Sequence, residues 1–457
     1  MKTHSALTSG PLVRQTLLLG TPLACGMLAH GLFNLVDMVM VARLGPGAVA
    51  SVTIGGLILP LGFLLFDGLS TATVERLSRA LGAGRHEEAQ RIAEESLRLA
   101  GFASLLCACA FGLGARPLVE FFAIDNAAVV EDGVAYLAIM GYGMAGMIFI
   151  LQTTAILRAA GSGRWPLAIL VGANIANLVF AAGLIYGLAG LPRMGVAGAA
   201  LGTVLAQLLF AVLGVLLLLR GVNGLRLRGR QLIGGVPSLR SLLAQGLPTS
   251  LQLAARVVSV FLMLRIAREL TQGSASAFMD GVGLCVRLEM LAVFMGLGFG
   301  AAATPFVAQN LGAGEAQRAG RGVWVLAAAA AICMGLAAAA LWWWHEPVLL
   351  GLMPELRPES LAAARNYLSV LLPFMPGLGV GVVLARGLNG AGSTRTAMVL
   401  DIGLYLVLLL PLAMTIAPTT GGRGPAAVWW CIGGVHAVAA LLYSVLWQRG
   451  KWKTRKR

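Results

Sequence analysis

The chain is poor in charge and lacks the motifs that usually mark enzymes and metal sites. Only 12% of its 457 residues are charged, and its mean hydropathy is +0.83; soluble globular proteins are about 25% charged. The five histidines are scattered, and no G-x-x-x-x-G-K-[ST], H-E-x-x-H or paired C-x-x-C motif occurs. These features exclude a soluble globular protein, a P-loop in this chain and the common zinc sites. We expect no enzyme activity.

Cysteine is also scarce, and its placement argues against a disulfide framework. All six cysteines fall inside apolar segments, where they read as small core residues and not as metal ligands. They are Cys25, Cys107, Cys109, Cys285, Cys333 and Cys431.

Long apolar runs are abundant instead. Twelve of them reach the roughly 20 residues that a helix needs to cross a bilayer. The runs are continuous and do not alternate with period two, which excludes a β-barrel. They lie near residues 15–42, 48–73, 93–114, 131–156, 166–188, 196–219, 246–268, 276–307, 321–344, 362–386, 396–417 and 426–447. The sequence therefore predicts an all-α integral membrane protein with twelve transmembrane helices.

The charge that is present is mainly basic and lies between these runs. The formal net charge is +15, which in a soluble protein would indicate a nucleic-acid partner. Here most loop arginines fall on alternate connections, together with the basic tail "KWKTRKR", so topology explains them better. We expect both termini in the cytoplasm, a location in the plasma (inner) membrane and no nucleic-acid partner.

Two halves of the chain repeat the same short motifs. "SRALGAG" at 78–84 matches "AQNLGAG" at 308–314, and "GSGR" at 161–164 matches "GSTR" at 392–395. The near-constant offset predicts two homologous, pseudo-symmetric lobes of six helices, inserted with the same orientation. We place the first lobe at 1–220, a cytoplasmic linker at 221–242 and the second lobe at 243–457.

One carboxylate lies deep in the first apolar run. Asp37 falls within "LFNLVDMVMVARLG", where a charged side chain at mid-bilayer costs roughly 2.5–3.5 kcal/mol. Such residues face a bundle interior or a water-filled cavity and often carry protons or ions. His30 and Asn34 have the spacing to share its helix face. The structural alternative is that Asp37 only makes hydrogen bonds between helices.

Polar residues in other runs are candidates for lining a substrate cavity. Arg287 and Glu289 are two positions apart, so they do not face each other on a helix, and each is expected to pair elsewhere. Arg256 and Arg265 are expected to line the cavity or to extend toward the interface. The cavity candidates are Asn34, Asn174, Tyr142, Arg287, Glu289, Tyr367 and Asp401.

The order of several motifs resembles that of the MATE family, the multidrug and toxic-compound extrusion transporters. "NLVDMVMVARLGPGAVAS" is similar to the family's opening motif, and "ALGAGRHEEAQR" and "QNLGAGEAQRAGR" to its loops after spans two and eight. "LRAAGSGRWPL" and "LNGAGSTRTAM" are similar to its loops before spans five and eleven, and "MGVAGAALGTVLAQ" to the start of span six. The resemblance covers about residues 15–445.

The resemblance implies a V-shaped bundle of two six-helix lobes that exports cationic drugs against a proton or sodium gradient. By the family pattern, Asp37, Asn177 and Thr203 match a cation-coupling site in the first lobe. Pro22 matches a proline whose kink accompanies protonation. The family's second aspartate of this site would fall at Ala181, so a tight sodium site is in doubt.

The sequence thus favours a proton-coupled antiporter for amphipathic organic cations. The alternatives are a sodium-coupled version, a flippase or exporter of a lipid-linked or natural-product substrate, and, from another class, an intramembrane enzyme or receptor. A flippase for anionic head groups would need several cavity arginines, for which Arg256, Arg265 and Arg287 are available. The expected partners are a small cationic substrate and the lipid bilayer. We expect a monomer with no cofactor besides the coupling ion, a proton or sodium.

Overall fold

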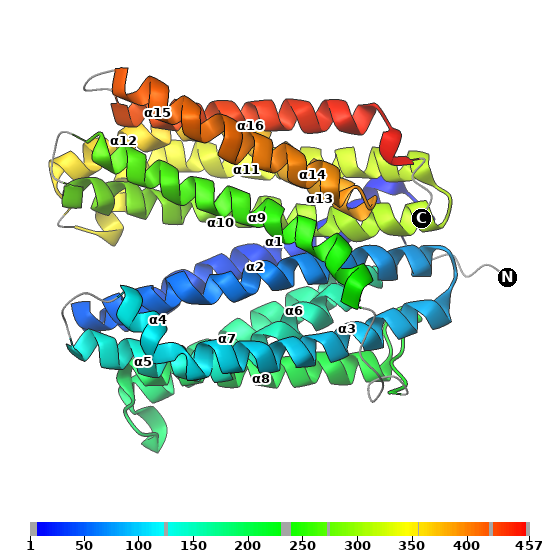
Figure 1. Ribbon diagram of the computed structural model, residues 1–457, viewed down its shortest axis with the longest axis horizontal. Helices are drawn as coiled ribbons and strands as arrows, with labels where there is room; N and C mark the ends of the chain where they lie inside the picture. Colours follow the sequence, from blue (N-terminus) through cyan, green and yellow to red (C-terminus); the bar gives the residue numbers. More distant parts are fainter. Residues whose placement is uncertain are drawn as a thin grey trace. The chain divides into compact units, whose positions relative to one another are not determined.

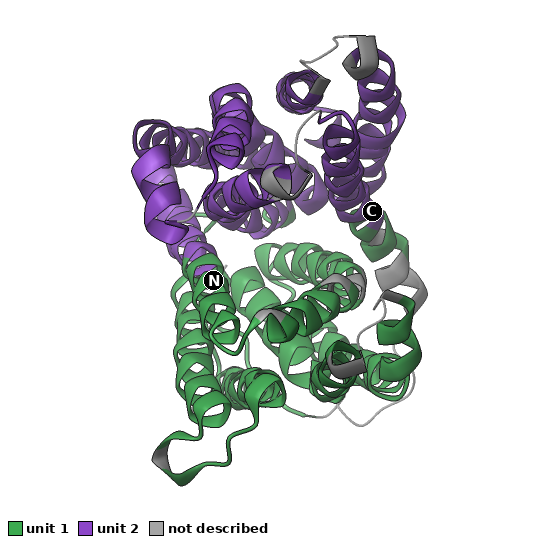
Figure 2. Ribbon diagram, turned by 90° about the vertical axis from the view of Figure 1, so that its left-hand side faces the viewer, with its two compact units in different colours: residues 1–9, 29–250, 312–314 green, residues 10–28, 251–311, 315–457 purple. Residues whose placement is uncertain are grey.

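The computed structural model describes residues 7–122, 127–229, 239–271, 275–354, 356–419 and 424–453. These residues are helical almost throughout, and the isolated bridge between Val222 and Leu225 is their one extended pairing. The chain forms two compact units, coloured green and purple in Figure 2. Unit 1 comprises 1–9, 29–250 and 312–314, and unit 2 comprises 10–28, 251–311 and 315–457.

The helices of unit 1 pack against one another (Figure 1). They are the second half of α1 (Leu12–Ala42), α2 (Pro46–Gly82), α3 (His86–Cys107), α4 (Ala115–Phe122), α5 (Ala127–Tyr142), α6 (Met144–Ala159), α7 (Arg164–Tyr186) and α8 (Gly195–Arg220). A π-helical segment, Ala108–Leu113, extends α3. The helix α9 (Leu239–Glu269) begins in this unit and ends in the other.

Unit 2 contains the first half of α1 and most of α9. It adds α10 (Ala275–Gly312), α11 (Ala316–Leu352), α12 (Pro358–Leu371), α13 (Met375–Gly390), α14 (Thr394–Asp401), α15 (Leu409–Thr419) and α16 (Gly424–Gln448). The π-helical segment Ile402–Leu408 joins α14 to α15, so these elements form one continuous span. The packed pairs include α11 with α13 and α13 with α16.

Every predicted apolar run falls on helix. Ten helical stretches of the described residues are long and apolar enough to cross a membrane, and the pair α5–α6, bent by 44°, makes an eleventh. The second predicted run lies on α2, a helix of 37 residues. The prediction of an all-α, multi-pass membrane protein is therefore confirmed.

The predicted lobe boundaries are not tested by the structure, and the predicted burial of the cysteines is only partly correct. The units are defined by internal contacts, so the lobe boundaries predicted from the repeat stay predictions, and residues 230–238 of the predicted linker lie outside the described residues. The six cysteines are free thiols, but Cys25 and Cys109 are exposed. The expectation that all six are core residues is wrong for these two, because their apolar helices turn one face outward.

Candidate functional site

Asp37, Asn177 and Thr203 come together within unit 1. The Asn177 side-chain amide on α7 donates a hydrogen bond to Asp37 Oδ2 on α1 at 2.6 Å. The Asn177 carbonyl oxygen in turn accepts a bond from the Thr203 hydroxyl on α8 at 3.0 Å. Asn177 is buried and bridges the other two groups, which are half-buried. Three residues far apart in the chain therefore form one polar cluster.

Close packing of α7 against α8 makes this cluster possible. A Cβ atom added at Gly202 would lie 2.5 Å from the backbone nitrogen of Ala181, and one added at Gly198 would lie 2.6 Å from the Leu184 carbonyl oxygen. Small residues spaced four apart let helix backbones approach in this way. Because Gly202 precedes Thr203, the approach brings the Thr203 hydroxyl within reach of Asn177.

The charge of Asp37 has no cationic partner among the described residues. Its Oδ2 accepts the Asn177 bond, and no described residue donates a bond to its Oδ1. Ala181, where the family pattern has a second aspartate, is buried against α8 and has no side-chain oxygen. The site therefore holds one carboxylate with one oxygen still available.

Further polar contacts join α1 to α7 along the α1 face that carries Asp37. The His30 side chain is hydrogen-bonded to Asn174, and Asn34 lies 3.5 Å from the His30 ring nitrogen. Tyr186 at the end of α7 donates to the Met40 carbonyl oxygen at 3.0 Å. The predicted shared face of His30, Asn34 and Asp37 is thus a polar seam toward α7.

Tyr136 also lies near Asp37, although the sequence analysis did not identify it as a candidate. It is half-buried on α5 and interacts electrostatically with Asp37. Its ring covers Gly55 on α2, where an added Cβ would lie 2.6 Å from the ring. A tyrosine in an apolar run resembles any core aromatic residue, so only the fold could reveal it.

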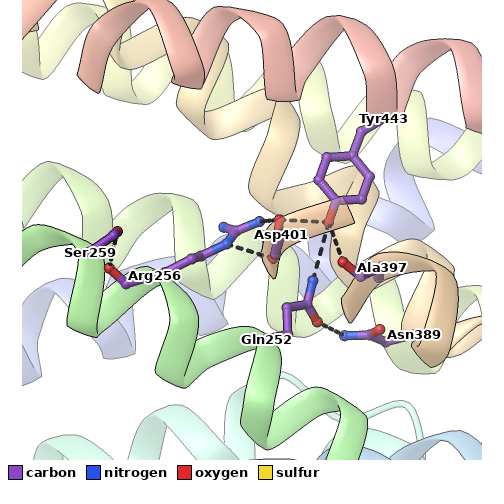
Figure 3. Close-up of polar contacts among 7 residues, drawn as sticks. All are labelled: Gln252, Arg256, Ser259, Asn389, Ala397, Asp401 and Tyr443. Atoms are coloured by element: carbon purple, nitrogen blue, oxygen red, sulfur yellow. Dashed lines mark hydrogen bonds and ion pairs between the residues drawn. The ribbon is translucent and has the colours of Figure 1, made fainter. Parts of the chain in front are cut away.

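A second polar network lies in unit 2 (Figure 3). Asp401 is fully buried and accepts two bonds from Arg256, at 2.8 and 3.0 Å, and one from the Tyr443 hydroxyl at 2.8 Å. Gln252 links Tyr443 to Asn389 through bonds of 3.3 and 3.1 Å. Asp401 and Arg256 therefore neutralise each other, and this arginine does not extend to the interface.

Glu289 has a different environment in the same unit. It is buried on α10 and accepts a hydrogen bond from the Tyr367 hydroxyl on α12. The Tyr367 ring packs edge-on against Trp429, with ring centroids 4.9 Å apart. The sequence analysis treats Glu289 and Tyr367 as separate cavity candidates, and the structure pairs them by this hydrogen bond.

The remaining candidates do not join either cluster. Arg287 is exposed and makes no ion pair with a described residue, and Tyr142 is exposed beside Gly112. Arg265 pairs with Glu269 at 3.0 Å, on the exposed surface. Pro22 lies inside α1, which continues through it as one helix, and its expected kink stays a prediction.

The comparisons with known proteins agree with this architecture. A family model described as MatE matches residues 22–182 and 248–415, which is most of the chain. The chain therefore belongs to the MATE family of transporters, and it is a multi-pass membrane protein.

Similar proteins cover nearly its whole length. The FAD transporter of Shewanella oneidensis is 24% identical over 93% of this chain and 92% of its own. Multidrug resistance protein PmpM of Pseudomonas aeruginosa is 25% identical over 91% and 87%. A solved outward-facing structure of a multidrug resistance MATE family transporter of the MOP superfamily has a TM-score of 0.88 at 21% identity, over 98% and 97% of the two chains. This last likeness shows the fold.

Proposed function

We propose that the protein is a proton-coupled antiporter that exports amphipathic organic cations across the plasma (inner) membrane, with both termini in the cytoplasm. The observation that carries the proposal is the carboxylate of Asp37, which has no ion-pair partner among the described residues and accepts a hydrogen bond through one oxygen from the neutral amide of Asn177. A negative charge without a cationic partner in an apolar helix is expected to bind either a proton or a cationic substrate. Relatives named for multidrug resistance support the substrate class.

The donor set favours a proton over sodium. A hard cation prefers several oxygen ligands, and carboxylates are the strongest of these. Asn177 presents its nitrogen to Asp37, and its oxygen is occupied by Thr203. Ala181 has no side-chain ligand. A proton, in contrast, needs only the one free oxygen of Asp37.

Protonation would change the Asp37–Asn177 hydrogen bond in a defined direction. A bond to a charged group contributes roughly 1.5–3 kcal/mol, and a neutral pair about 0.5–1.5 kcal/mol. Neutralising Asp37 therefore weakens this contact by about 1 kcal/mol, roughly a fivefold shift in any equilibrium that depends on it. We infer that ionised Asp37 attracts the cation, and that a proton arriving from outside displaces it and loosens α1 from α7.

An anionic substrate is the main alternative, because one relative is named an FAD transporter. Recognition of phosphate groups favours arginines that are free to bind them. Arg256 and Arg265 are each engaged in an ion pair, which leaves Arg287 of the three arginines considered. With one of the three arginines outside an ion pair, an anionic flippase substrate is disfavoured. Sodium coupling is a second alternative.

The test is efflux from proteoliposomes loaded with ethidium or with FAD, under an imposed proton or sodium gradient. We expect proton-driven ethidium efflux, and its loss in Asp37→Asn. The matched control is Asp132→Asn, which removes an exposed carboxylate of the same unit and should leave efflux unchanged. Efflux driven only by sodium, movement of FAD without ethidium, or full activity in Asp37→Asn would each contradict the proposal.

A further inference from the structure

Two buried carboxyl groups in the described part of unit 2 have contrasting surroundings. Asp401 is balanced by Arg256, with both charges inside one network. Glu289 is 9% exposed, and among the described residues no lysine, arginine or histidine forms an ion pair with it. A buried ionised carboxylate without a counter-charge is strongly disfavoured in an apolar medium. We therefore expect Glu289 to be protonated, whereas Asp401 can stay ionised because Arg256 neutralises its charge.

The surroundings of Glu289 form a continuous seam between α10 and α12. Gly281 packs on the Ser360 backbone, and Cys285 lies 3.9 Å from the Ala364 carbonyl oxygen. One turn further along α10, Glu289 meets Tyr367. Because the described apolar stretch of this helix begins at Asp280, Glu289 lies about 13 Å inside it at 1.5 Å per residue.

Among the described residues, the groups that face Glu289 can hold a proton but provide too few ligands for a metal cation. From α12 comes the Tyr367 hydroxyl, which donates to one carboxyl oxygen, and from α10 itself comes the Cys285 thiol, which interacts with Glu289 electrostatically. The helix α16 contributes Trp429 behind Tyr367, and its side chain does not titrate. Arg287 on α10 is exposed and does not pair with Glu289. One carboxyl and one phenol are too few oxygens for a metal cation.

We propose that Glu289, held by Tyr367, is a second proton-binding site, and that its proton is carried in addition to the proton on Asp37. The proposal rests on the proposed proton antiport. It assigns Glu289 to coupling, whereas the sequence alone had suggested a substrate-lining role. Tyr367 is a positioning residue, because its hydroxyl can donate to the carboxyl group in either protonation state.

The first test needs no transport. Infrared spectroscopy of the purified Asp37→Asn protein should show the carbonyl band of a protonated carboxylic acid at a pH where exposed carboxyl groups are ionised. Adding Glu289→Gln should remove this band, and adding Tyr367→Phe should shift it by removing the hydrogen bond. Glu269→Gln, which replaces an exposed carboxyl group of the same unit, is the control and should change nothing. Identical spectra with and without Glu289 would overturn the proposal.

The second test measures the carried proton. If one of two coupled protons is lost, ethidium accumulation at steady state in Glu289→Gln should fall about tenfold for each pH unit of imposed gradient. Glu289→Asp retains a carboxyl group and should restore part of the loss. Loss of the infrared band with unchanged accumulation would refute the claim that this proton is carried. If the unmutated protein shows no proton-driven efflux, the proposed antiport fails, and the infrared result still decides whether Glu289 binds a proton.

Discussion

The ion pair between Arg256 and Asp401 should make either single substitution more harmful to folding than the double substitution. Asp401 is fully buried, and the Arg256 side chain is 19% exposed. Three donors reach the carboxylate, two of them from the one guanidinium group and the third from Tyr443. Arg256→Met therefore removes two of three hydrogen bonds together with the only counter-charge known for Asp401 among the described residues.

The expected changes in the free energy of unfolding follow from these three hydrogen bonds and the one ion pair. Breaking a buried ion pair by removing one partner costs about 3–5 kcal/mol, because the other charge is left uncompensated. Arg256→Met and Asp401→Leu should each fall in this range. Tyr443→Phe removes one bond to a charged group and should cost roughly 1.5–3 kcal/mol. The double variant Arg256→Met with Asp401→Leu buries no charge and should lie within about 1–2 kcal/mol of the unmutated protein.

The assay is the free energy of unfolding, measured by steric trapping in bicelles. A double-mutant cycle then gives the interaction energy directly, provided that each single substitution adds no new contact. We expect an interaction energy of several kcal/mol. Additive single effects, or a double variant less stable than both singles, would refute the reasoning that the two charges depend on each other.

Three further predictions concern unit 1, and the first has a control substitution in unit 2. Gly202→Val should destabilise the protein by about 1–3 kcal/mol, because its Cβ atom would lie 2.5 Å from the Ala181 backbone. The control is Gly434→Ala in α16, where an added Cβ atom would meet no other part of the described chain within 4 Å, and it should be neutral or slightly stabilising in the same unfolding assay. Equal effects of the two substitutions on the free energy of unfolding would contradict the packing argument. Ala181→Asp should introduce sodium-dependent ethidium efflux by adding the missing carboxylate, and unchanged sodium response would count against the donor-set argument. Asn177→Leu should slow proton-driven efflux several-fold while the protein stays folded, and normal efflux would exclude the bridging role of Asn177.

The helical architecture was predictable because the bilayer imposes strong constraints on sequence. Runs of about 20 apolar residues have few alternatives to a transmembrane helix, and each predicted run falls on helix. Asp37, Asn177 and Thr203 can also be identified from the sequence, but only the family resemblance places them in one site. Spacing alone gives no reason to join residues that are 140 and 26 positions apart.

The partners of the buried charges could not be predicted in this way. Arg256 and Asp401 are 145 positions apart, and Glu289 and Tyr367 are 78 apart. Each pairing depends on how one helix is rotated against another. For Glu289 and Tyr367, close packing of Gly281 on the Ser360 backbone helps to set how α10 lies against α12. Sequence reasoning can therefore identify the charged residues whose burial in apolar helices is unfavourable. The fold is needed to show which of these charges are neutralised by a partner.

The most direct test of the central claim is to run the exchange in reverse and to follow the proton. An ethidium gradient is imposed across proteoliposomes without any initial pH difference, and the internal pH is recorded with a trapped indicator. The account predicts proton movement opposite to ethidium in the unmutated protein, and a loss of this movement in Asp37→Asn but not in Asp132→Asn. Ethidium flux with no accompanying proton movement, or the same proton movement without Asp37, would contradict it.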